Sequence, residues 1–267
     1  MSLSTRGFVL GCNKNICNWQ LFTVRRYPFR ERKLFASNDE LILLLQSANY
    51  LPYGFDDKLF FNLLALSVYK ETNELFFSDS VDLLRKLGLQ HINSSRIDDS
   101  LKRLSSVIIN FFHWFDPSSP EKHTKKYFQL LSCSLQDDGK NIKGIRIRIN
   151  QDAKEILTSK DNYWSKLNLC EFNNLSTTAR HLYLFLIAHI RNDSFRCNIQ
   201  DFGDKIGFGN YARIRRLREK FRENIEEINR KTSVKSWIIF DKDKENLRFC
   251  GAHEDNNKMR MKSLVDI

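Results

Sequence analysis

The sequence predicts an α+β protein, mainly helical, in which two units follow one another and each ends in a small antiparallel β-hairpin. Two stretches carry apolar residues at helical spacing, and strand-like alternation follows each of them. Only four prolines and ten glycines occur among 267 residues, which argues against a turn-rich all-β design. This length suits two domains. We expect an N-terminal segment, a first domain, a second domain and a polar tail at residues 1–17, 18–160, 161–252 and 253–267.

The second unit is expected to run from about Leu175 to Phe249 as helix, short strand, helix, helix and hairpin. Gly207 and Gly209 supply the turn before its third helix. The first helix has Leu182, Phe185, Leu186 and His189 on its buried face, and Asn173, Asn174 or Ser176 can cap its start. The elements expected after it are the strand Phe195–Ile199, the helix Gln200–Ile206, a basic helix from Asn210, and the hairpin strands Ser236–Phe240 and Asn246–Phe249. This order is typical of a winged helix.

The helix that begins near Asn210 joins an apolar stripe to a block of positive charge. Six of the thirteen residues from Asn210 to Arg222 are Arg or Lys, whereas most of the glutamates come later. This order opposes the helix dipole, which favours acidic side chains in the first turn, and an unfavourable local choice suggests a functional reason. We expect the core face to consist of Ile214, Leu217, Phe221, Ile225 and Ile228.

A helix of this kind can lie on phosphate and enter the major groove of DNA with its N-terminal half leading. Its cations are therefore the main DNA-binding candidates. From a projection at 100° per residue, we expect Arg213, Arg216 and Lys220 to face the groove and Arg215, Arg218 and Arg222 to lie mainly on phosphate, with Tyr211 as a further candidate. The alternative is an ordinary solvated charged face.

The first unit repeats this order of elements without obvious residue identity. Its long helix is expected to bury Ile97, Leu101, Leu104, Ile108 and Phe111. The expected elements are helix Asp57–Tyr69, strand Leu75–Phe77, helix Ser78–Leu87 closed by Gly88, helix Ser95–Phe112, and a hairpin of Tyr127–Leu135 with Ile142–Ile149. Before them, Leu41–Leu45 fits a strand or a short buried helix. The predicted fold is thus two tandem winged-helix domains, each with a hairpin wing.

The first unit carries fewer candidate DNA contacts. Its long helix has Arg96, Lys102 and Arg103, but also early acidic residues. On the last strand Arg146 and Arg148 alternate with isoleucines, so one strand face is basic. Contact with phosphate and ordinary exposure to solvent are equally consistent with these two arginines. We expect weaker DNA contact in this unit and more room for a partner protein or a second copy of the chain.

The charge balance limits the kinds of partner. Forty-three Lys and Arg against 32 Asp and Glu give a net charge of +11, which suits a polyanion such as nucleic acid or an anionic membrane. No apolar run approaches the roughly 18 residues of a spanning helix, so the membrane interpretation is disfavoured. The six cysteines form no Cys-x-x-Cys pair, and we find no secretion signal. We therefore expect free thiols and a cytoplasmic protein.

The sequence offers little sign of catalysis, and we expect no enzymatic activity, metal or cofactor. DNA-nicking initiators hold a metal with a His-hydrophobic-His pair, but the six histidines here are scattered. Gly203, Gly207 and Gly209 do not fit a nucleotide-binding Gly-x-x-x-x-Gly-Lys loop. The acidic pair Asp56–Asp57 stands at an expected helix start, where we interpret it as a cap.

Several motifs, taken in order, resemble plasmid replication initiators of the RepA kind, over roughly residues 18 to 250. The matching stretches are Leu51-Pro-Tyr-Gly54 before an apolar helix, Leu83–Leu89 with its Leu-Gly-Leu stop, Arg96 with Leu101–Leu104, Leu175–Phe185, and the arginine-rich helix that contains Phe221. Two features depart from the family: Gln90–Ser94 replaces a glycine-rich turn after Leu89, and the proline common before the second-domain helix is missing.

The resemblance implies two winged-helix domains and binding to repeated duplex sites in a plasmid origin. It also implies local opening of DNA, recruitment of the host initiator and the replicative helicase, and a homodimer that represses its own gene while monomers initiate. One alternative is a winged-helix transcriptional repressor that binds an operator. A more distant alternative is a protein-interaction module whose basic helix binds an acidic partner.

Overall fold

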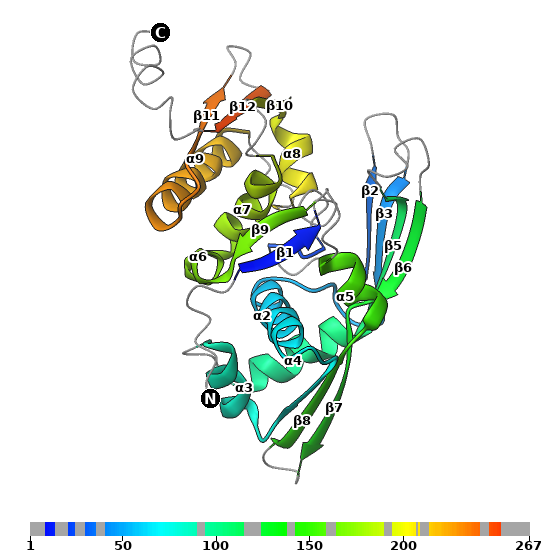
Figure 1. Ribbon diagram of the computed structural model, residues 1–267. Helices are drawn as coiled ribbons and strands as arrows, with labels where there is room; N and C mark the ends of the chain where they lie inside the picture. The colour runs from blue at the N-terminus through cyan, green and yellow to red at the C-terminus, as the bar shows by residue number, and fades with distance from the viewer. Residues whose placement is uncertain are drawn as a thin grey trace.

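The computed structural model describes residues 9–13, 21–24, 30–35, 41–89, 94–114, 124–137, 142–158, 164–189, 194–206, 208, 214–240 and 246–251. In this part of the chain, helices are mixed with small antiparallel sheets, which confirms the α+β class with more strand than expected. Figure 1 shows one helical unit at the upper left, a four-stranded sheet at the right, and a further group of helices and strands below.

The helical unit at the upper left contains the second half of the chain. Its elements are α6 (Leu169–Asn174), α7 (Thr177–His189), β10 (Ser194–Asn198), α8 (Ile199–Lys205), α9 (Ile214–Lys231), β11 (Ser236–Phe240) and β12 (Asn246–Gly251). This order is the expected one, except that α6 was not anticipated. The strands form a sheet in the order β10-β12-β11. Asn198 caps α8 and Ser176 accepts from the first turn of α7, since short polar side chains satisfy free N–H groups there.

The helices of the first unit also follow the expected order. They are α2 (Asp56–Tyr69), α3 (Ser80–Leu87) and α4 (Ser94–Ser106), with strand β4 (Glu74–Phe77) between the first two. The side chain of Asp79 caps α3 by accepting from the N–H of Asp82 at 2.7 Å. Gly88 ends α3 with φ at 67°, a left-handed conformation in which a side chain would be strained.

The prediction that the long helix continues to Phe112 is wrong, because the helix ends at Ser106 and a strand follows directly. Strand β5 (Val107–Trp114) pairs with β3 (Leu41–Ser47) and with β6 (Thr124–Gln129). With β2 (Glu31–Phe35) they form a sheet in the order β2-β3-β5-β6. Burial alternates along β5, because Ile109 and Phe111 are inside while Ile108 is 42% exposed. β-Branched and aromatic residues fit such a pleated surface better than a helix.

The hairpin expected at Tyr127–Leu135 and Ile142–Ile149 is divided between two sheets. Leu130 interrupts the first arm, so that β6 joins the four-stranded sheet while β7 (Leu131–Asp137) pairs with β8 (Ile142–Ile149). β4 pairs with the other edge of β8, which gives a sheet in the order β4-β8-β7. Most of the turn expected at this hairpin, residues 138–141, lies outside the described residues.

A two-stranded sheet joins the start of the chain to the second unit. Strand β1 (Val9–Asn13) pairs along its whole length with β9 (Trp164–Asn168), and helix α5 (Gln151–Thr158) packs against β1. Sequence patterns gave no sign of these three elements. Leu10 and Cys12 turn inward and are almost completely buried, so the strand contributes to the core.

Buried polar contacts connect the two units, and we refer to Asp57, Arg180, Asn62 and Asn173 as the polar clamp. Arg180 of α7 forms two hydrogen bonds of 2.8 Å with the carboxylate of Asp57 on α2, and the two side chains are 5% and 0% exposed. Arg180 also donates to the carbonyls of Gly54 and Leu175. The amides of Asn62 and Asn173 bond reciprocally at 2.9 and 3.1 Å.

The interpretation of Asp56 and Asp57 as helix caps accounts for only part of their bonding. Both accept from backbone N–H groups at the start of α2, Asp56 from Tyr53 at 2.9 Å and Asp57 from Lys58, but both carboxylates are also completely buried. Asp56 binds Arg103 of α4, and Asp57 binds Arg180. Carboxylates in this position need a cationic partner, because a buried charge without one is costly. The acidic pair therefore holds two other helices against α2.

Acidification is expected to weaken the fold through His181, which lies beside the polar clamp. Its Nδ1 donates to the carbonyl of Ile206 at 2.8 Å, and Asp57, Arg180 and Arg32 lie around it. Complete burial lowers the pKa of His181 from 6.5 to about 4, although Asp57 opposes this. The unfolded chain takes up the proton near pH 6.5. Stability is therefore complete above that pH and falls, by on the order of 3 kcal/mol, as the pH decreases to about 4.

Urea denaturation at about pH 7.5 and about pH 5 measures this loss. His181→Gln, which keeps a donor for Ile206, should lose less stability between the two pH values than the unchanged protein. Burial also raises the pKa of Asp56, but this group is common to both proteins and cancels in the comparison. Equal losses in the two proteins would contradict the assignment to His181.

Candidate nucleic-acid interface

Aromatic packing positions helix α9 against the rest of its unit. Phe221 lies between Phe202 and Phe208, with ring centroids 5.5 and 5.1 Å away, and Phe185 contacts Phe202 at 4.6 Å. The buried face of α9 consists of Leu217, Phe221, Asn224, Ile225 and Ile228. Ile214, expected on this face, is 38% exposed, so the expected stripe holds only from Leu217 onward.

Helices α8 and α9 approach closely at Gly203. A Cβ atom added there would lie 3.0 Å from Cδ2 of Leu217, which is itself completely buried. Gly203→Val is therefore expected to destabilise the protein by about 1–3 kcal/mol through overpacking. Thermal unfolding would measure this, with the exposed Val81→Ala as a mild control. A Gly203→Val protein as stable as the unchanged chain would contradict the close packing.

The C-terminal half of α9 is tied to the junction between α6 and α7. Thr178 donates to the buried amide oxygen of Asn224 at 2.8 Å, and Ser176 donates to Glu227 from both its N–H and its hydroxyl, at 2.9 and 2.6 Å. Lys231 donates to the carbonyl of Asn174 at 2.9 Å. These bonds fix the direction of α9 at its C-terminal half, while Leu217 and Phe221 hold its N-terminal half against the rest of the unit.

The N-terminal half of α9 carries exposed cations on its outer side. Arg216 and Arg222 are exposed, and the side chain of Arg215 is 88% exposed although it bonds Glu219 at 3.0 Å. Lys220, expected to face away from the core, is 35% exposed and bonds Glu223 at 2.9 Å. Arg215, which was expected to flank the apolar stripe, is thus the more exposed of the two, and Lys220, which was expected to face away from it, is the less exposed. Surface ion pairs of this spacing are worth only about 0.3–0.5 kcal/mol, so an anionic ligand can displace them.

Two predicted contacts, Tyr211 and Arg213, lie outside the described residues, as do Gly207 and Gly209 of the expected turn. Arg218 is described and is partly buried. The first turn of α9 contains no acidic residue, and its last turn contains Arg230 and Lys231. The described part of the helix therefore presents positive charge at the end where the dipole is already positive.

Two arginines that we did not single out from the sequence lie on the adjacent sheet. Arg196 of β10 and Arg248 of β12 are directly opposite one another, and both are exposed. A usable signal was present, because Arg248 alternates with Leu247 and Phe249 along its strand.

The cations of α4 differ in their availability. Arg96 is exposed and lies 5.5 Å from the ring of Phe55, and Lys102 is exposed beside Asp98, whose hydrogen bond raises the pKa of the ammonium group. Arg103 forms two bonds to Asp56, at 2.7 and 2.9 Å, and its side chain is only 12% exposed. Burial opposes its charge, but the bond to Asp56 outweighs this and raises the pKa of Arg103. Its guanidinium is thus committed to holding α2 and α4 together.

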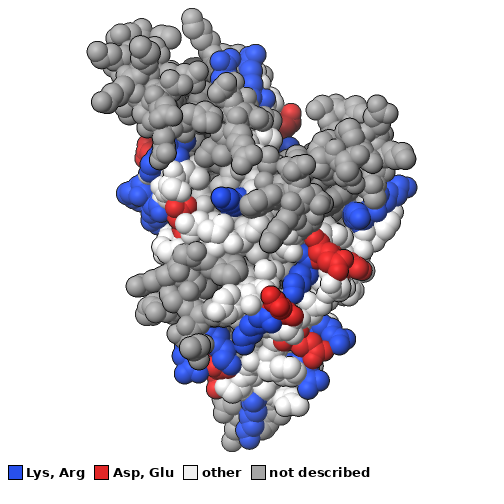
Figure 2. Space-filling view, viewed as in Figure 1, with Lys and Arg blue, Asp and Glu red and all other residues white. Residues whose placement is uncertain are grey.

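The remaining candidates lie on β8. Arg146 is exposed and its guanidinium stands 4.8 Å from the centre of the Phe76 ring. Arg148 is 66% exposed and bonds Glu74 at 2.7 Å. Figure 2 shows Lys and Arg side chains over α9 at the left and at the lower end, where β7 and β8 lie. The structure therefore places the candidate residues in two separate regions and does not join them in one patch.

The titratable groups of the described residues do not assemble into a metal site, because no cluster of three or more His, Cys, Asp or Glu side chains has suitable geometry there. Burial raises the pKa of Cys133 to about 11 and that of Cys197 to about 12, so both thiols stay protonated. No described helix is both long enough and apolar enough to cross a membrane.

These features define a class of α+β protein with small antiparallel sheets and a helix that has a buried apolar face and an exposed, cation-rich face. No protein-family model and no curated protein sequence matches the chain. Among solved structures it is similar to a selenomethionine derivative of domains 2 and 3 of RctB, with a TM-score of 0.57 and 16% identity over 89% of this chain and 97% of that one. A second structure of RctB domains 2–3 gives a TM-score of 0.53 and 16% identity, over 92% and 99% of the two chains. At this identity the likeness shows a shared fold.

Proposed function

We propose that this protein is a DNA-binding replication initiator and that its two units are tandem winged helices. The observation that carries the proposal is the build of α9, whose C-terminal half is anchored while Arg215, Arg216 and Arg222 project from its other half. A recognition helix needs this arrangement, since its N-terminal residues enter the major groove and meet phosphates and guanine edges.

The sheet topologies support the tandem arrangement. In the second unit, the strand before α8 pairs with the last strand of the hairpin, which gives the order β10-β12-β11. In the first unit, the strand before α3 likewise pairs with the last strand of its hairpin, in the order β4-β8-β7. Two helices follow the first strand in both cases. We take this repeated order as support for two winged helices with the hairpin as the wing, although in the first unit β5 and β6 lie between α4 and the hairpin.

The likeness to RctB domains 2–3 is consistent with this role, since RctB is a replication initiator. The resemblance to initiators of the RepA kind adds the finer parts of the proposal. The protein would bind repeated duplex sites at a plasmid origin, open DNA through binding energy without catalysis or a cofactor, and recruit the host initiator and helicase. A homodimer and a cytoplasmic location belong to the same proposal.

The proposed DNA contacts are concentrated on α9, with Arg196 and Arg248 on the neighbouring sheet. Arg96, Lys102, Arg146 and Arg148 supply weaker contacts from the first unit. Arg103 is omitted, because leaving Asp56 for a phosphate would strand a buried carboxylate.

Fluorescence anisotropy on duplex fragments that flank the protein's own gene tests the proposal, with shuffled duplexes as controls and a salt series around 0.15 M. Specific binding should exceed binding to the controls by about a thousandfold or more. Selective binding to direct repeats would support the initiator. Binding confined to an inverted repeat at the promoter would favour a repressor, and equal weak binding to every duplex would contradict specific DNA recognition.

A further inference from the structure

The outer face of the β4-β8-β7 sheet differs from its buried face in having an aromatic ring among polar and basic side chains. Leu75, Phe77, Ile145 and Ile147 turn inward. On the outer face the Phe76 ring is 55% exposed, and the guanidinium of Arg146 lies 4.8 Å from its centre. Register places Phe76 and Ser134 on either side of Arg146 in one row across the three strands.

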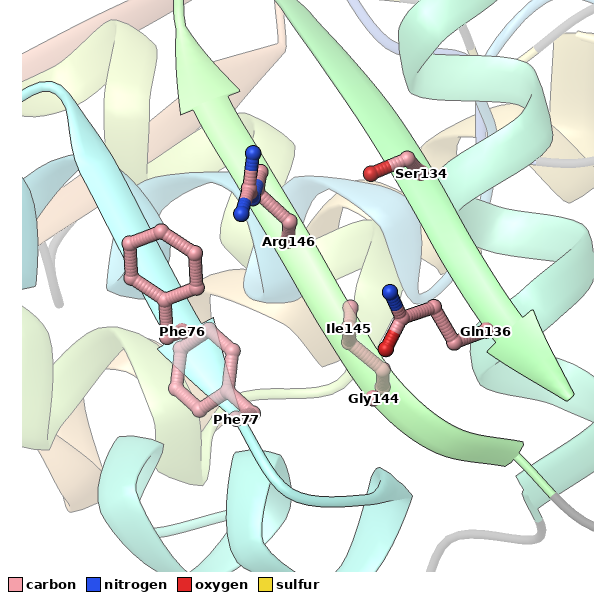
Figure 3. A pocket seen from close by; sticks show the side chains of 7 residues that line it. All are labelled: Phe76, Phe77, Ser134, Gln136, Gly144, Ile145 and Arg146. Carbon is pink, nitrogen blue, oxygen red and sulfur yellow. The ribbon is translucent and has the colours of Figure 1, made fainter.

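A half-open depression lies beside this row. It has a volume of about 200 Å³, and its outer-face lining includes Phe76, Arg146, Ser134 and Gln136. Gly144 shapes it, because the missing side chain leaves room for Gln136 to extend from β7 across the neighbouring strand. Figure 3 shows the Phe76 ring and the Arg146 side chain on adjacent strands, with the amide of Gln136 directed toward Gly144.

Size and chemistry limit what the depression can hold. Pockets for small-molecule ligands usually measure about 300–1,000 Å³ and enclose most of the ligand, so a free metabolite would be poorly held here. One planar ring on a polymer is a better match. The Phe76 ring and the Arg146 guanidinium offer flat faces for stacking, and Ser134 and Gln136 offer donors and acceptors for the edge of the ring.

The surrounding charge favours a polyanion. Arg146 and the 66% exposed Arg148 project from β8. On α3, Arg85 is 71% exposed and Lys86 reaches to 3.5 Å from the carbonyl of Phe76, while both bond Asp82. Aromatic faces interleaved with cations are the usual means by which proteins hold single strands without reading sequence.

We propose that this depression binds an unpaired base of single-stranded DNA, with stacking on Phe76 and with Arg146 and Arg148 near the backbone. The inference rests on the proposed function, because opening of an origin supplies the strand. In this proposal the first unit binds single-stranded DNA, whereas α9 of the second unit binds duplex DNA. The opened strand would be held at one end of the molecule and the duplex at another.

Anisotropy of a fluorescein-labelled oligothymidylate of about 15 nucleotides tests this inference. Phe76→Ala should weaken binding on the order of tenfold, with an unchanged salt dependence, because stacking releases no counterions. Arg146→Gln should reduce the slope of log affinity against log salt by about 0.7, the value for one phosphate of a single strand. The matched control is Tyr127→Ala, which removes a ring that is 57% exposed on another sheet and should bind like the unchanged protein.

Gly144→Val serves as a second variant that fills the depression. Its new Cβ would lie 3.0 Å from Oε1 at the movable end of Gln136 and in ordinary contact with Cβ and Cδ of the same side chain, so the strand can accept it. A loss of affinity similar to that of Phe76→Ala is expected. Unchanged affinity in both variants, or an equal loss with Tyr127→Ala, would overturn the inference. Binding to origin duplex, measured in parallel, separates the two proposals. A protein that binds duplex repeats but no oligothymidylate refutes only the inference, whereas one that binds only oligothymidylate refutes the proposed function.

Discussion

Replacing Arg180 by alanine is expected to lower the free energy of unfolding by about 3–5 kcal/mol. The change leaves the carboxylate of Asp57 completely buried without its cation, and it removes the donors to the carbonyls of Gly54 and Leu175. Urea denaturation followed by circular dichroism measures the loss. The unfolding transition should also broaden or divide, because α2 and α7 belong to different units and lose their main polar contact.

Two further variants make this test specific. Arg230→Ala removes an exposed arginine from α9 and should change stability by less than about 0.5 kcal/mol. Combining Asp57→Ala with Arg180→Ala should cost much less than the sum of the single changes, because no buried charge is then left unpaired. If Arg180→Ala costs less than about 1 kcal/mol, the pair behaves like a surface ion pair and the polar clamp does not hold the units together.

Removing Arg215 and Arg216 together is expected to weaken specific duplex binding by two to four orders of magnitude. Each contact to a phosphate or a guanine edge is worth about 1–3 kcal/mol, and separate contacts add approximately. Both side chains are exposed, so the fold should be unaffected. Anisotropy on the preferred duplex measures the loss, and binding to shuffled duplex reveals whether specificity falls as well. A reduced salt slope alone would assign these residues to phosphate.

The matched control for this variant is Lys70→Ala combined with Arg230→Ala. It removes the same two positive charges from exposed positions, one after α2 and one at the far end of α9. Long-range attraction to DNA depends on net charge and should fall equally in the two proteins. Equal losses of affinity would mean that the start of α9 makes no direct contact, and the proposed interface would then be wrong.

Local patterns predicted α2, α3, α7, α8 and α9 because their signals lie close together in the chain, but they gave no sign of α5 and α6. The Asp79 cap and the Gly88 stop of α3 are within ten residues of one another. The run Val107–Phe112 was predicted to be helical because its apolar residues fit a helical spacing as well as the alternation of a strand. Pairing with β3 and β6 makes it a strand. Partners such as Asp57 and Arg180 are 123 residues apart, so no local signal joins them.

In the candidate interface, too, local features were predictable from the sequence and features that depend on distant residues were not. The excess of cations at the start of α9 is a local property of the sequence and was predicted. Their orientation depends on which residue of the helix is the first to be buried in the core. The helical projection counted Ile214 as a core residue, although it is 38% exposed. The projection was therefore rotated about the helix axis, so that Lys220 was expected to be more exposed than Arg215, whereas the structure shows the reverse. The depression at Phe76 needs three strands brought together from distant segments, and no motif in the sequence indicates it.

The pairing of β1 with β9 has a consequence for biosynthesis. Asn168, the partner of Val9, is made 159 residues after it. At about 5–20 residues per second, β1 waits on the order of 10–30 s for its partner. During that interval Leu10 and Cys12, which end up buried, are exposed on an unpaired edge, and such edges promote association between chains. Slow translation of the first half should therefore increase aggregation of the nascent protein, and a chain that begins after β1 should escape this effect at some cost in final stability.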